Sequence, residues 1–584
     1  MTRVARFIAT CLLLGTCPVR GGPQAYDLVI RGATIVDGTG KPSYVGDVAI
    51  RGDRIVAAGK ADDQAAREIS GRGLVLAPGW IDPHSHADLA LVRMPLAENL
   101  VMQGITTFVG GNCGMTAAPR KDLTFGKWLE TVEKTGISIN YAPLVGHNQI
   151  RQLVLGQDFK RPARPEEIGA MKQHLDEAFR SGAIGFSTFL DPSPAEYATT
   201  NELIELAETA RRYDALFVPH TRGIQSQWSS NDPEEYGYGI QHAPLEDAYI
   251  GRYKGFLEAI EVSRRSRVRL HIAHISNAYL MPQPHPDFLE EAQVLATRGI
   301  IDEARKEGID VTYDIIAWDS SIAGATRIAD EFADPRQPWV ARFGKDQLTG
   351  TRFVENLKNP GFRAELRKVY DAGRLKLGMI HTKVDPYWCD HFRILKCTLR
   401  ECEGKTVGEV ALVRDKGPLD TVFDILVADP ETIWVQFVDP RMLPTAISTF
   451  LKDPNSMPST DTSIYPAQPG PNAGPTLAYG LYPNYIRTNV NRKRLLTLEE
   501  AVQKATSYPA GRFGLKDRGV IRQGAYADLV LFDLQTIGYS GDFLNPAVRP
   551  SGIECVIVNG EVVYEKDSHT GRKPGKVLRR KDQS

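Results

Sequence analysis

The sequence predicts an α/β fold: a (β/α)8 TIM barrel with a small β-sandwich formed from both chain ends and an inserted subdomain near the barrel mouth. Three observations support this prediction. Eight short apolar runs alternate with helical patterns across residues 75–514. Strands of another style, separated by glycines, occupy residues 26–74 and 515–575. The alternation fails over about residues 319–450, a stretch too long for a bare loop.

Composition is that of a globular protein with one large domain and appendages. The chain has 584 residues, 42% of them hydrophobic and 24% charged. Its net charge is −1, and the only basic block is the short tail Arg579-Arg580-Lys581, so nucleic acid is not an expected partner. We expect a small-molecule substrate instead, and a homo-oligomer is possible.

The N-terminus has the pattern of an export signal. Arg3 and Arg6 precede an apolar stretch over residues 7–15 that is too short to span a bilayer. We therefore expect residues 1–25 to be a signal peptide, no other membrane span, and a periplasmic or secreted protein. A lipid anchor on Cys17 is the less favoured alternative, because Thr16 is bulkier than the residue usual at such cleavage sites.

Both ends of the chain carry short strands. Residues 26–74 contain alternating strands with glycine turns, which predict a small antiparallel β unit. Similar strands recur at residues 527–533 and 556–564. Neither piece has enough strands to be stable alone, so we expect 26–74 and 515–575 to fold together as the sandwich.

The barrel strands are expected in the buried run that opens at Val75 and in seven later runs. These are residues 104–109, 139–145, 183–187, 215–220, 269–274, 310–314 and 456–461. Thr199 with Glu202, and Thr497 with Glu500, form capping boxes that open two of the intervening helices. Another helix is predicted by an apolar stripe at Ile168, Met171, Leu175 and Ala178. In such barrels the active groups lie at the carboxyl ends of the strands.

The apolar run that opens at Val75 ends in His84 and His86. Their i, i+2 spacing places both rings on one side of an extended backbone. Two neutral imidazoles at about 2.0–2.1 Å from one ion are ordinary zinc ligands. A solvent-facing His-Ser-His loop is the alternative. The rest of the sequence favours ligation.

Four more candidates follow predicted strands. Cys113 lies after the second strand, His220 ends the fifth, His274 ends the sixth and Asp461 ends the eighth. Taken singly, a residue of this type near a strand end more often packs in the core or makes a hydrogen bond than binds a metal. Four such residues at the same end of a barrel favour a shared metal site. His271 is out of phase with His274 and is expected to be structural.

Five cysteines remain after the expected signal, and an odd count in an oxidising compartment indicates one thiol with another role. Cys113 is the candidate. The other four could form disulfides, although the sequence does not fix their pairing: Cys389, Cys397, Cys402 and Cys555.

From about residue 27 to residue 565 the sequence resembles the amidohydrolase superfamily, and within it the N-acyl-D-amino-acid deacylase (D-aminoacylase) group. The matching motifs are Ala77-Pro78-Gly79-Trp80-Ile81-Asp82-Pro83-His84-Ser85-His86, Gly111-Asn112-Cys113-Gly114, Val145-Gly146-His147-Asn148, Gly182-Ala183-Ile184-Gly185-Phe186-Ser187-Thr188, Pro219-His220-Thr221-Arg222, Ala273-His274-Ile275-Ser276, Ser459-Thr460-Asp461 and Gly524-Ala525-Tyr526-Ala527-Asp528-Leu529-Val530.

The resemblance implies a centre of one or two zinc ions. His84, His86 and Asp461 would hold one position, and Cys113, His220 and His274 the other. Asp461 would also be the catalytic general base and acid. A separation of more than about 6 Å between the Cys113 sulfur and the His220 and His274 rings would contradict this arrangement.

The sequence departs from that group where it would bind substrate. Ile316 replaces a family tyrosine, Ser276 a lysine and Asn484 an arginine. Losing two cations removes charge-assisted bonds to a substrate carboxylate, each worth on the order of 1.5–3 kcal/mol. Arg222 is a possible replacement or else is paired at the rim, and Trp318 is a further candidate for substrate contact.

The function expected is therefore hydrolysis of a non-peptide amide by a metal-dependent amidohydrolase, with N-acyl-D-amino acids or related N-acyl compounds as substrates. Hydrolysis of a cyclic amide or an unusual dipeptide is the alternative. A metal-binding protein without activity is less favoured, because every expected ligand and Asp461 are present.

Overall fold

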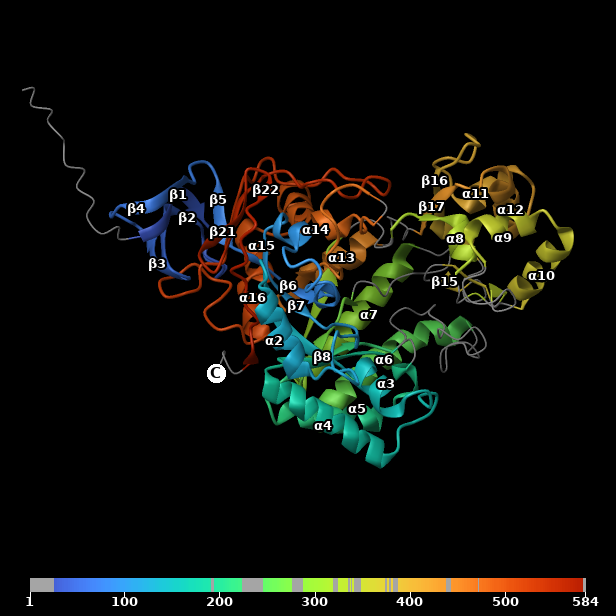
Figure 1. Ribbon diagram of the computed structural model, residues 1–584, viewed down its shortest axis with the longest axis horizontal. Helices are drawn as coiled ribbons and strands as arrows, with labels where there is room; N and C mark the ends of the chain where they lie inside the picture. The colour runs from blue at the N-terminus through green and yellow to red at the C-terminus, as the bar shows by residue number, and fades with distance from the viewer. Residues whose placement is uncertain are drawn as a thin grey trace, which may run out of the picture.

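A computed structural model describes residues 26–190, 194–222, 245–275, 287–318, 324–334, 337, 339–340, 348–372, 375–377, 380–381, 387–436, 443–470 and 472–580. The expected signal at residues 1–25, with Cys17, lies outside these ranges, and so does Ser276. Figure 1 shows a small sheet at one end of the molecule, the barrel in the middle and a separate helical part at the other end.

Eight parallel strands form the barrel, as predicted. They are β6 (Trp80–Ser85), β7 (Ile105–Gly110), β8 (Asn140–Gly146), β9 (Gly185–Phe189), β10 (Leu216–His220), β11 (Arg269–Ile272), β12 (Val311–Ile316) and β18 (Ser456–Ser459), paired in that order. The two outer strands meet through backbone hydrogen bonds, 2.7 Å from His86 N to Thr462 O and 2.9 Å from Asp461 N to His84 O. These bonds bring the carboxyl ends of the first and last strands together.

The expected start of the barrel at residue 75 is wrong. Val75–Pro78 is β5 of the small sheet, where it pairs with β1 (Tyr26–Ile35) and β19 (Leu529–Phe532). The chain then crosses into the barrel at Gly79, where a Cβ atom would lie 2.1 Å from the Thr106 side chain. A continuous apolar run therefore serves two sheets, because glycine permits this close approach.

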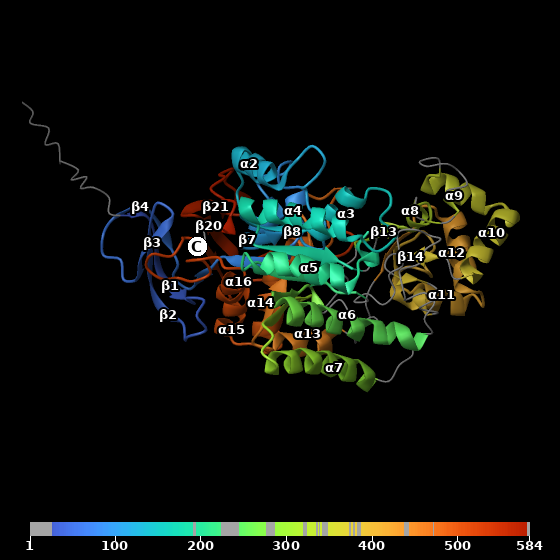
Figure 2. The same cartoon turned by 90° about the horizontal axis from the view of Figure 1, so that it is seen from below.

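Helices surround the barrel in chain order, and Figure 2 shows several of them following one another around it. They include α1 (Glu98–Val101), α2 (Phe125–Thr135), α3 (His147–Leu155), α4 (Pro165–Ser181), α5 (Thr200–Arg211), α6 (Leu245–Ser266), α7 (Asp287–Lys306), α13 (Leu443–Leu451), α14 (Leu477–Ile486), α15 (Leu498–Ala505) and α16 (Ser507–Arg512). The predicted apolar stripe of α4 is buried.

Only one of the two predicted capping boxes is complete. Thr497 and Glu500 bond each other's backbone at the start of α15. At α5, Thr199 accepts from Glu202 N, but the Glu202 carboxylate bonds His147 and Arg151 instead. Tertiary partners thus replace a local cap, and His147 is held away from the strand-end cluster.

The inserted subdomain has its own core. Its elements are β13 (Thr326–Arg327), α8 (Ile328–Phe332), α9 (Gly350–Leu357), α10 (Pro360–Asp371), β14 (Lys376–Leu377), β15 (Ile380–His381), β16 (Phe392–Lys396), α11 (Val407–Val413), α12 (Pro418–Ala428) and β17 (Ile433–Gln436). Its buried residues run from Ile328 to Trp434. The expected boundary near residue 450 is too late, because Ala446, Ile447 and Phe450 of α13 pack in the barrel core.

Both chain ends join in one nine-stranded sheet. The other strands are β2 (Tyr44–Arg51), β3 (Arg54–Gly59), β4 (Ala65–Ser70), β20 (Ile553–Val558), β21 (Glu561–Glu565) and β22 (Ser568–His569). The pairings of β1 with β4 and β5 are parallel, although the sequence predicted an antiparallel unit. Within the described residues, no helix has the length and apolar character needed to cross a membrane.

The possible disulfides are absent from the described part of the chain. All five described cysteines are buried free thiols. Cys389, Cys397 and Cys402 pack in the core of the inserted subdomain, whereas Cys555 packs in the small sheet. The two groups therefore lie in separate cores.

Candidate metal centre

Six predicted residues meet at the carboxyl ends of the barrel strands. Cys113 Sγ lies 3.4 Å from His84 Nε2, 3.4 Å from His274 Nε2 and 3.8 Å from His220 Nδ1. Asp461 joins from the last strand, with Oδ1 3.3 Å from His84 Nε2 and 3.1 Å from His86 Nε2. The sulfur thus satisfies the distance criterion set from the sequence.

The spacing suits a zinc-sized ion. In a tetrahedral site with Zn–S of about 2.3 Å and Zn–N of about 2.05 Å, neighbouring ligand atoms lie about 3.4–3.6 Å apart. The sulfur-to-nitrogen distances of 3.4 and 3.8 Å bracket this value, while His220 Nδ1 and His274 Nε2 are closer, at 2.9 Å. Ligand atoms of His84, Cys113, His274 and Asp461 all lie within 4.8 Å of one another. These residues fit the donor set that zinc prefers.

Three of these residues have left-handed backbone. The φ angle is 50° at Cys113, 31° at His274 and 48° at Asp461. This region is unfavourable for residues with a Cβ, costing of order 1–3 kcal/mol, and such conformations cluster at functional sites. Each of these residues follows a strand, so the backbone turns at the point where the side chain must reach the shared centre.

The turn that carries Cys113 is held from several sides. Gly111 N donates to Asp88 Oδ1 at 3.0 Å, and Gly114 N donates to Ser187 Oγ at 2.9 Å. A Cβ on Gly111 would lie 2.3 Å from the Leu144 carbonyl oxygen. Groups from β8, β9 and the segment after β6 therefore fix the cysteine, and a larger residue at position 111 does not fit.

Asp314 in β12 is a site residue that the sequence reasoning missed. Its Oδ2 lies 3.1 Å from His271 Nε2 and 3.5 Å from His84 Nδ1. Its Oδ1 accepts from Ser459 Oγ at 2.6 Å and from His274 N at 3.1 Å. Asp314 therefore orients two candidate ligands from behind, as carboxylates do behind zinc-bound histidines. The sequence signal that could have revealed Asp314 was a carboxylate inside a strand that is otherwise apolar except for Thr312.

Asp82 performs a similar task between the first and last strands. Its two carboxylate oxygens accept hydrogen bonds from Thr460 N at 3.0 Å and from Thr460 Oγ1 at 2.5 Å. Thr460 directly precedes Asp461 in the chain, so these bonds fix the backbone next to Asp461. Burial raises its pKa to about 7, although these hydrogen bonds oppose the shift. His271 is structural, as expected, because it bonds Thr312 as well as Asp314.

The anionic members of the cluster are stabilised as anions. Burial alone would raise the pKa of the Cys113 thiol, but His84 and His274 hold it well below its usual value. The same two rings, with hydrogen bonds from His84 and His86, lower the pKa of Asp461 well below its usual value despite burial. A thiolate and a carboxylate among imidazoles form a site prepared for a cation.

Access to the centre is one-sided. His84, His220, His274 and Cys113 are buried, whereas the His86 and Asp461 side chains are 26% and 17% exposed. Among the described residues, the centre is therefore open to solvent on the side of His86 and Asp461.

The residues expected to contact the substrate do not form one group beside the metal-ligand cluster. Arg222 is engaged by Glu258 Oε2 at 3.0 Å and by the carbonyl oxygens of Glu196 and Ala198 at 2.7 and 2.8 Å. This favours the alternative in which Arg222 is structural. Asn484 is half-buried in α14, and its Oδ1 accepts from Thr488 Oγ1 at 3.4 Å.

Ile316 and Trp318 lie at the end of β12, close in sequence to Asp314. Ile316 is buried opposite Ser459. Trp318 is buried with its ring 5.9 Å from that of Tyr539, and its Nε1 has no hydrogen-bond partner among the described residues. This indole is the stronger candidate for a substrate hydrogen bond, because a buried N–H without a partner is costly.

Comparison with known proteins places this geometry in context. The chain is 29% identical over 576 residues to a D-aminoacylase of Alcaligenes xylosoxydans xylosoxydans, covering 95% of this chain and 98% of the relative. It matches the N-acyl-D-glutamate deacylase of Bordetella bronchiseptica in complex with zinc and a phosphonate inhibitor, with 25% identity and a TM-score of 0.66 over 95% and 99% of the two chains.

A solved D-aminoacylase with a binuclear metal centre matches similarly, with 26% identity and a TM-score of 0.66 over 95% of this chain and 100% of that one. The model of the amidohydrolase family matches residues 248–564, which is more than half of the sequence. With this match and the shared barrel, the chain belongs to the amidohydrolase family.

Proposed function

We propose that the protein is a metal-dependent deacylase of N-acyl-D-amino acids or related N-acyl compounds. The observation that carries the proposal is the convergence of Cys113, three buried histidines and Asp461 at the carboxyl ends of the barrel strands. The relatives named above are deacylases of N-acyl-D-amino acids, and their likeness extends over nearly the whole chain. The cyclic-amide alternative has weaker support for that reason.

Zinc is the proposed metal, and the residues fit it. Cys113, His220 and His274 would hold one ion, and His84, His86 and Asp461 a second. When bound, zinc supplies Lewis acidity to the amide carbonyl and lowers the pKa of water to about 7. A thiolate and neutral imidazoles are ligands that zinc prefers to magnesium or calcium.

Asp461 moves the proton in the proposed reaction. It is partly exposed at the open side of the centre, and its pKa lies well below its usual value, so it is a carboxylate at neutral pH. It takes a proton from the attacking water and then protonates the departing nitrogen, which turns the amine into a leaving group. General acid and base catalysis of this kind contributes roughly 10²–10⁴ in rate.

Arg222, the residue expected to replace a cationic partner of the substrate carboxylate, is engaged by other protein groups. Arg222 is bonded to Glu258 and to two carbonyl groups, so a free α-carboxylate is not its partner. We infer that the buried indole of Trp318 donates to the substrate instead. A neutral donor fits an N-acyl compound whose carboxylate is absent or masked as well as one with a free acid.

The decisive experiment combines metal analysis with a hydrolysis panel. Purified protein is freed of metal with a chelator, reloaded with zinc and assayed on matched N-acyl-D- and N-acyl-L-amino acids and their carboxamides. We expect hydrolysis only after reloading, and faster release of acyl product from the D-series. Full activity without metal, or turnover of cyclic amides alone, would overturn the proposal.

We also propose that the protein is exported, supported by Arg3, Arg6 and the apolar stretch at residues 7–15. Cell fractionation and N-terminal sequencing test this, and a lipid-modified Cys17 would indicate the anchored alternative.

We further propose that the protein forms a homo-oligomer. The supporting observation is the exposed apolar pair Leu412 and Val413 on the inserted subdomain. Light scattering of the wild type beside Leu412→Ser measures the association.

A further inference from the structure

A basic hollow lies at the opposite end of the barrel from the metal centre. It is a cavity of about 610 Å³ between the last turns of α5 and α6 and the side of α4. These turns lead into the amino-terminal ends of β10 and β11, whereas His220 and His274 follow the carboxyl ends of the same strands. The volume falls within the range of about 300–1,000 Å³ typical of small-molecule sites.

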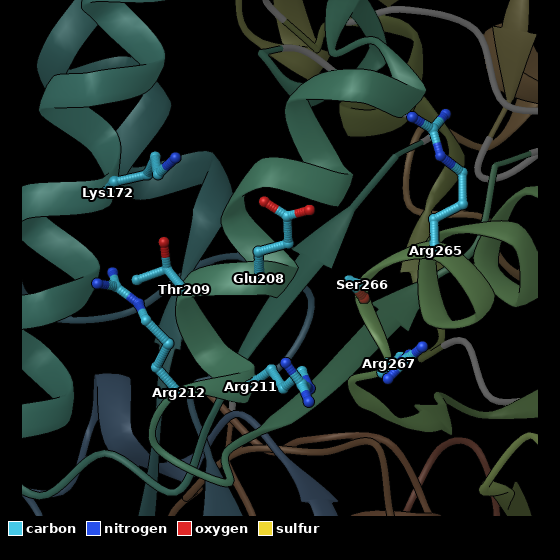
Figure 3. Close-up of a pocket in the computed structure, with 8 residues that line it drawn as sticks. All are labelled: Lys172, Glu208, Thr209, Arg211, Arg212, Arg265, Ser266 and Arg267. Carbon is cyan, nitrogen blue, oxygen red and sulfur yellow. The ribbon is translucent and has the colours of Figure 1, made fainter.

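The lining of the hollow is strongly cationic. Its residues are Lys172, Glu208, Thr209, Arg211, Arg212, Arg265, Ser266 and Arg267. Figure 3 shows Lys172 and Arg212 on one side, Arg265 and Arg267 on the other, and Glu208 and Arg211 between them. Five cations and one carboxylate thus line one cavity in a chain whose net charge is −1.

Two of the cations are paired and three are not. Lys172 Nζ lies 3.3 Å from Glu205 Oε2, and an Arg212 nitrogen lies 3.3 Å from Asp176 Oδ1. Arg211, Arg265 and Arg267 make no side-chain hydrogen bond or ion pair within the described residues and are exposed. Arginines at helix C-termini also interact favourably with the helix dipole, which explains why they gather there but leaves their guanidinium groups without an anion.

We propose that this hollow binds a multivalent oxyanion of the phosphate-ester class. Guanidinium groups bind phosphate oxygens in bidentate fashion, and three of them without partners provide more donors than one phosphate group requires. The Thr209 and Ser266 side chains add hydroxyl groups to the wall. The ligand is therefore a compound with at least two anionic groups, either free in solution or presented by a phospholipid headgroup.

Glu208 gives the site a distinctive signature. It lies among the five cations and makes no ion pair within the described part of the chain. A carboxylate there repels a bound oxyanion, so its removal strengthens binding.

The experiment uses the zinc-loaded full chain and fructose 1,6-bisphosphate as the soluble probe, measured by calorimetry. We expect saturable binding that weakens with added salt and is absent with neutral fructose. The triple variant Arg211→Gln, Arg265→Gln and Arg267→Gln raises the dissociation constant at least tenfold. The variant Glu208→Gln lowers it at least threefold.

A matched control removes three cations elsewhere. Arg492→Gln, Lys493→Gln and Arg494→Gln change the net charge equally, on an exposed run that does not line the hollow, and leave the dissociation constant within twofold. Equal weakening by both triple variants, or an unchanged constant in Glu208→Gln, would overturn the proposal.

Vesicles containing cardiolipin, whose headgroup carries two phosphodiester groups, test whether a lipid headgroup is the ligand. Sedimentation that is lost only in the hollow's triple variant supports the site with a lipid headgroup as its ligand. Because hydrolysis at the distant centre is not the readout, the result is independent of the proposed deacylase activity.

Discussion

Asp314 lies behind His84, with Oδ2 3.5 Å from the ring's Nδ1, so that Nε2 of the same ring is directed toward Cys113 and Asp461. The carboxylate also contacts His271, Ser459 and the backbone of His274. One side chain in β12 thereby sets the orientation of candidate ligands from two other strands.

Replacing Asp314 by Asn is expected to weaken zinc binding by about 10–100-fold, because the orienting negative charge is lost while the shape is kept. Competition with a chromogenic chelator measures the affinity. His271→Asn is the matched control, since, within the described residues, the hydrogen bonds of the His271 ring go to Thr312 and Asp314 and to none of the six candidate ligands. If both variants lose zinc equally, Asp314 acts through general stability instead.

Replacing Cys113 by Ala is expected to remove the metal position shared with His220 and His274. Zinc content measured by elemental analysis falls, and hydrolysis falls with it, because Cys113 is the only thiol of the cluster among the residues that the structure describes. Cys555→Ala removes an equally buried thiol from the small sheet and keeps both properties. Full zinc content in Cys113→Ala would contradict the assignment.

Asp461→Asn is expected to keep the fold and much of the zinc while reducing kcat roughly 10²–10⁴-fold, because the amide neither accepts nor returns the proton. Turnover within tenfold of wild type would exclude Asp461 as the proton carrier. Zinc analysis on the same sample separates lost chemistry from lost metal.

Arg222→Met is expected to lower stability and leave KM nearly unchanged. The guanidinium bonds Glu258 and two carbonyl oxygens, and hydrogen bonds to charged groups contribute about 1.5–3 kcal/mol. Denaturant unfolding and steady-state kinetics test both parts. A KM raised tenfold in a variant of normal stability would restore Arg222 as the partner of a substrate carboxylate.

Lys504 predicts a pH dependence far from the metal centre. Burial lowers its pKa to about 8, although Asp453 opposes the shift. The unfolded chain therefore binds more protons between about pH 8 and the ordinary lysine pKa near 10.4, so stability rises with pH across that window. The gain is about 3 kcal/mol at about pH 10.4 and above, and it is lost progressively as pH falls from about 10.4 to about 8.

Lys504→Met removes this titration. We expect the stability difference between wild type and variant to move in favour of wild type by about 3 kcal/mol from pH 8 to pH 10.5. Unfolding by urea at closely spaced pH values measures it. A difference that stays constant over the window would show that the lysine titrates normally.

The alternation of apolar runs and helical stripes was sufficient to predict eight strands and their order. The same local reading placed Cys113, His220, His274 and Asp461 after strands, where a parallel barrel gathers its active groups. Such patterns are visible in a sequence because they involve neighbours a few residues apart.

Other features depend on partners distant in the chain. The break at Gly79 follows from the position of Thr106, and Glu202 leaves its cap for His147 and Arg151. Arg222 looked available for a substrate until the structure placed Glu258 beside it. No pattern among neighbouring residues predicts these long-range contacts.

The sequence by itself determined the strands, the residue types at their ends and hence the family of chemistry. Only the tertiary structure decided the left-handed backbone at Cys113, His274 and Asp461, the support from Asp314 and the basic hollow between α5 and α6. The physical reason is that hydrogen bonds and close contacts between remote segments select one geometry among the many that local preferences allow.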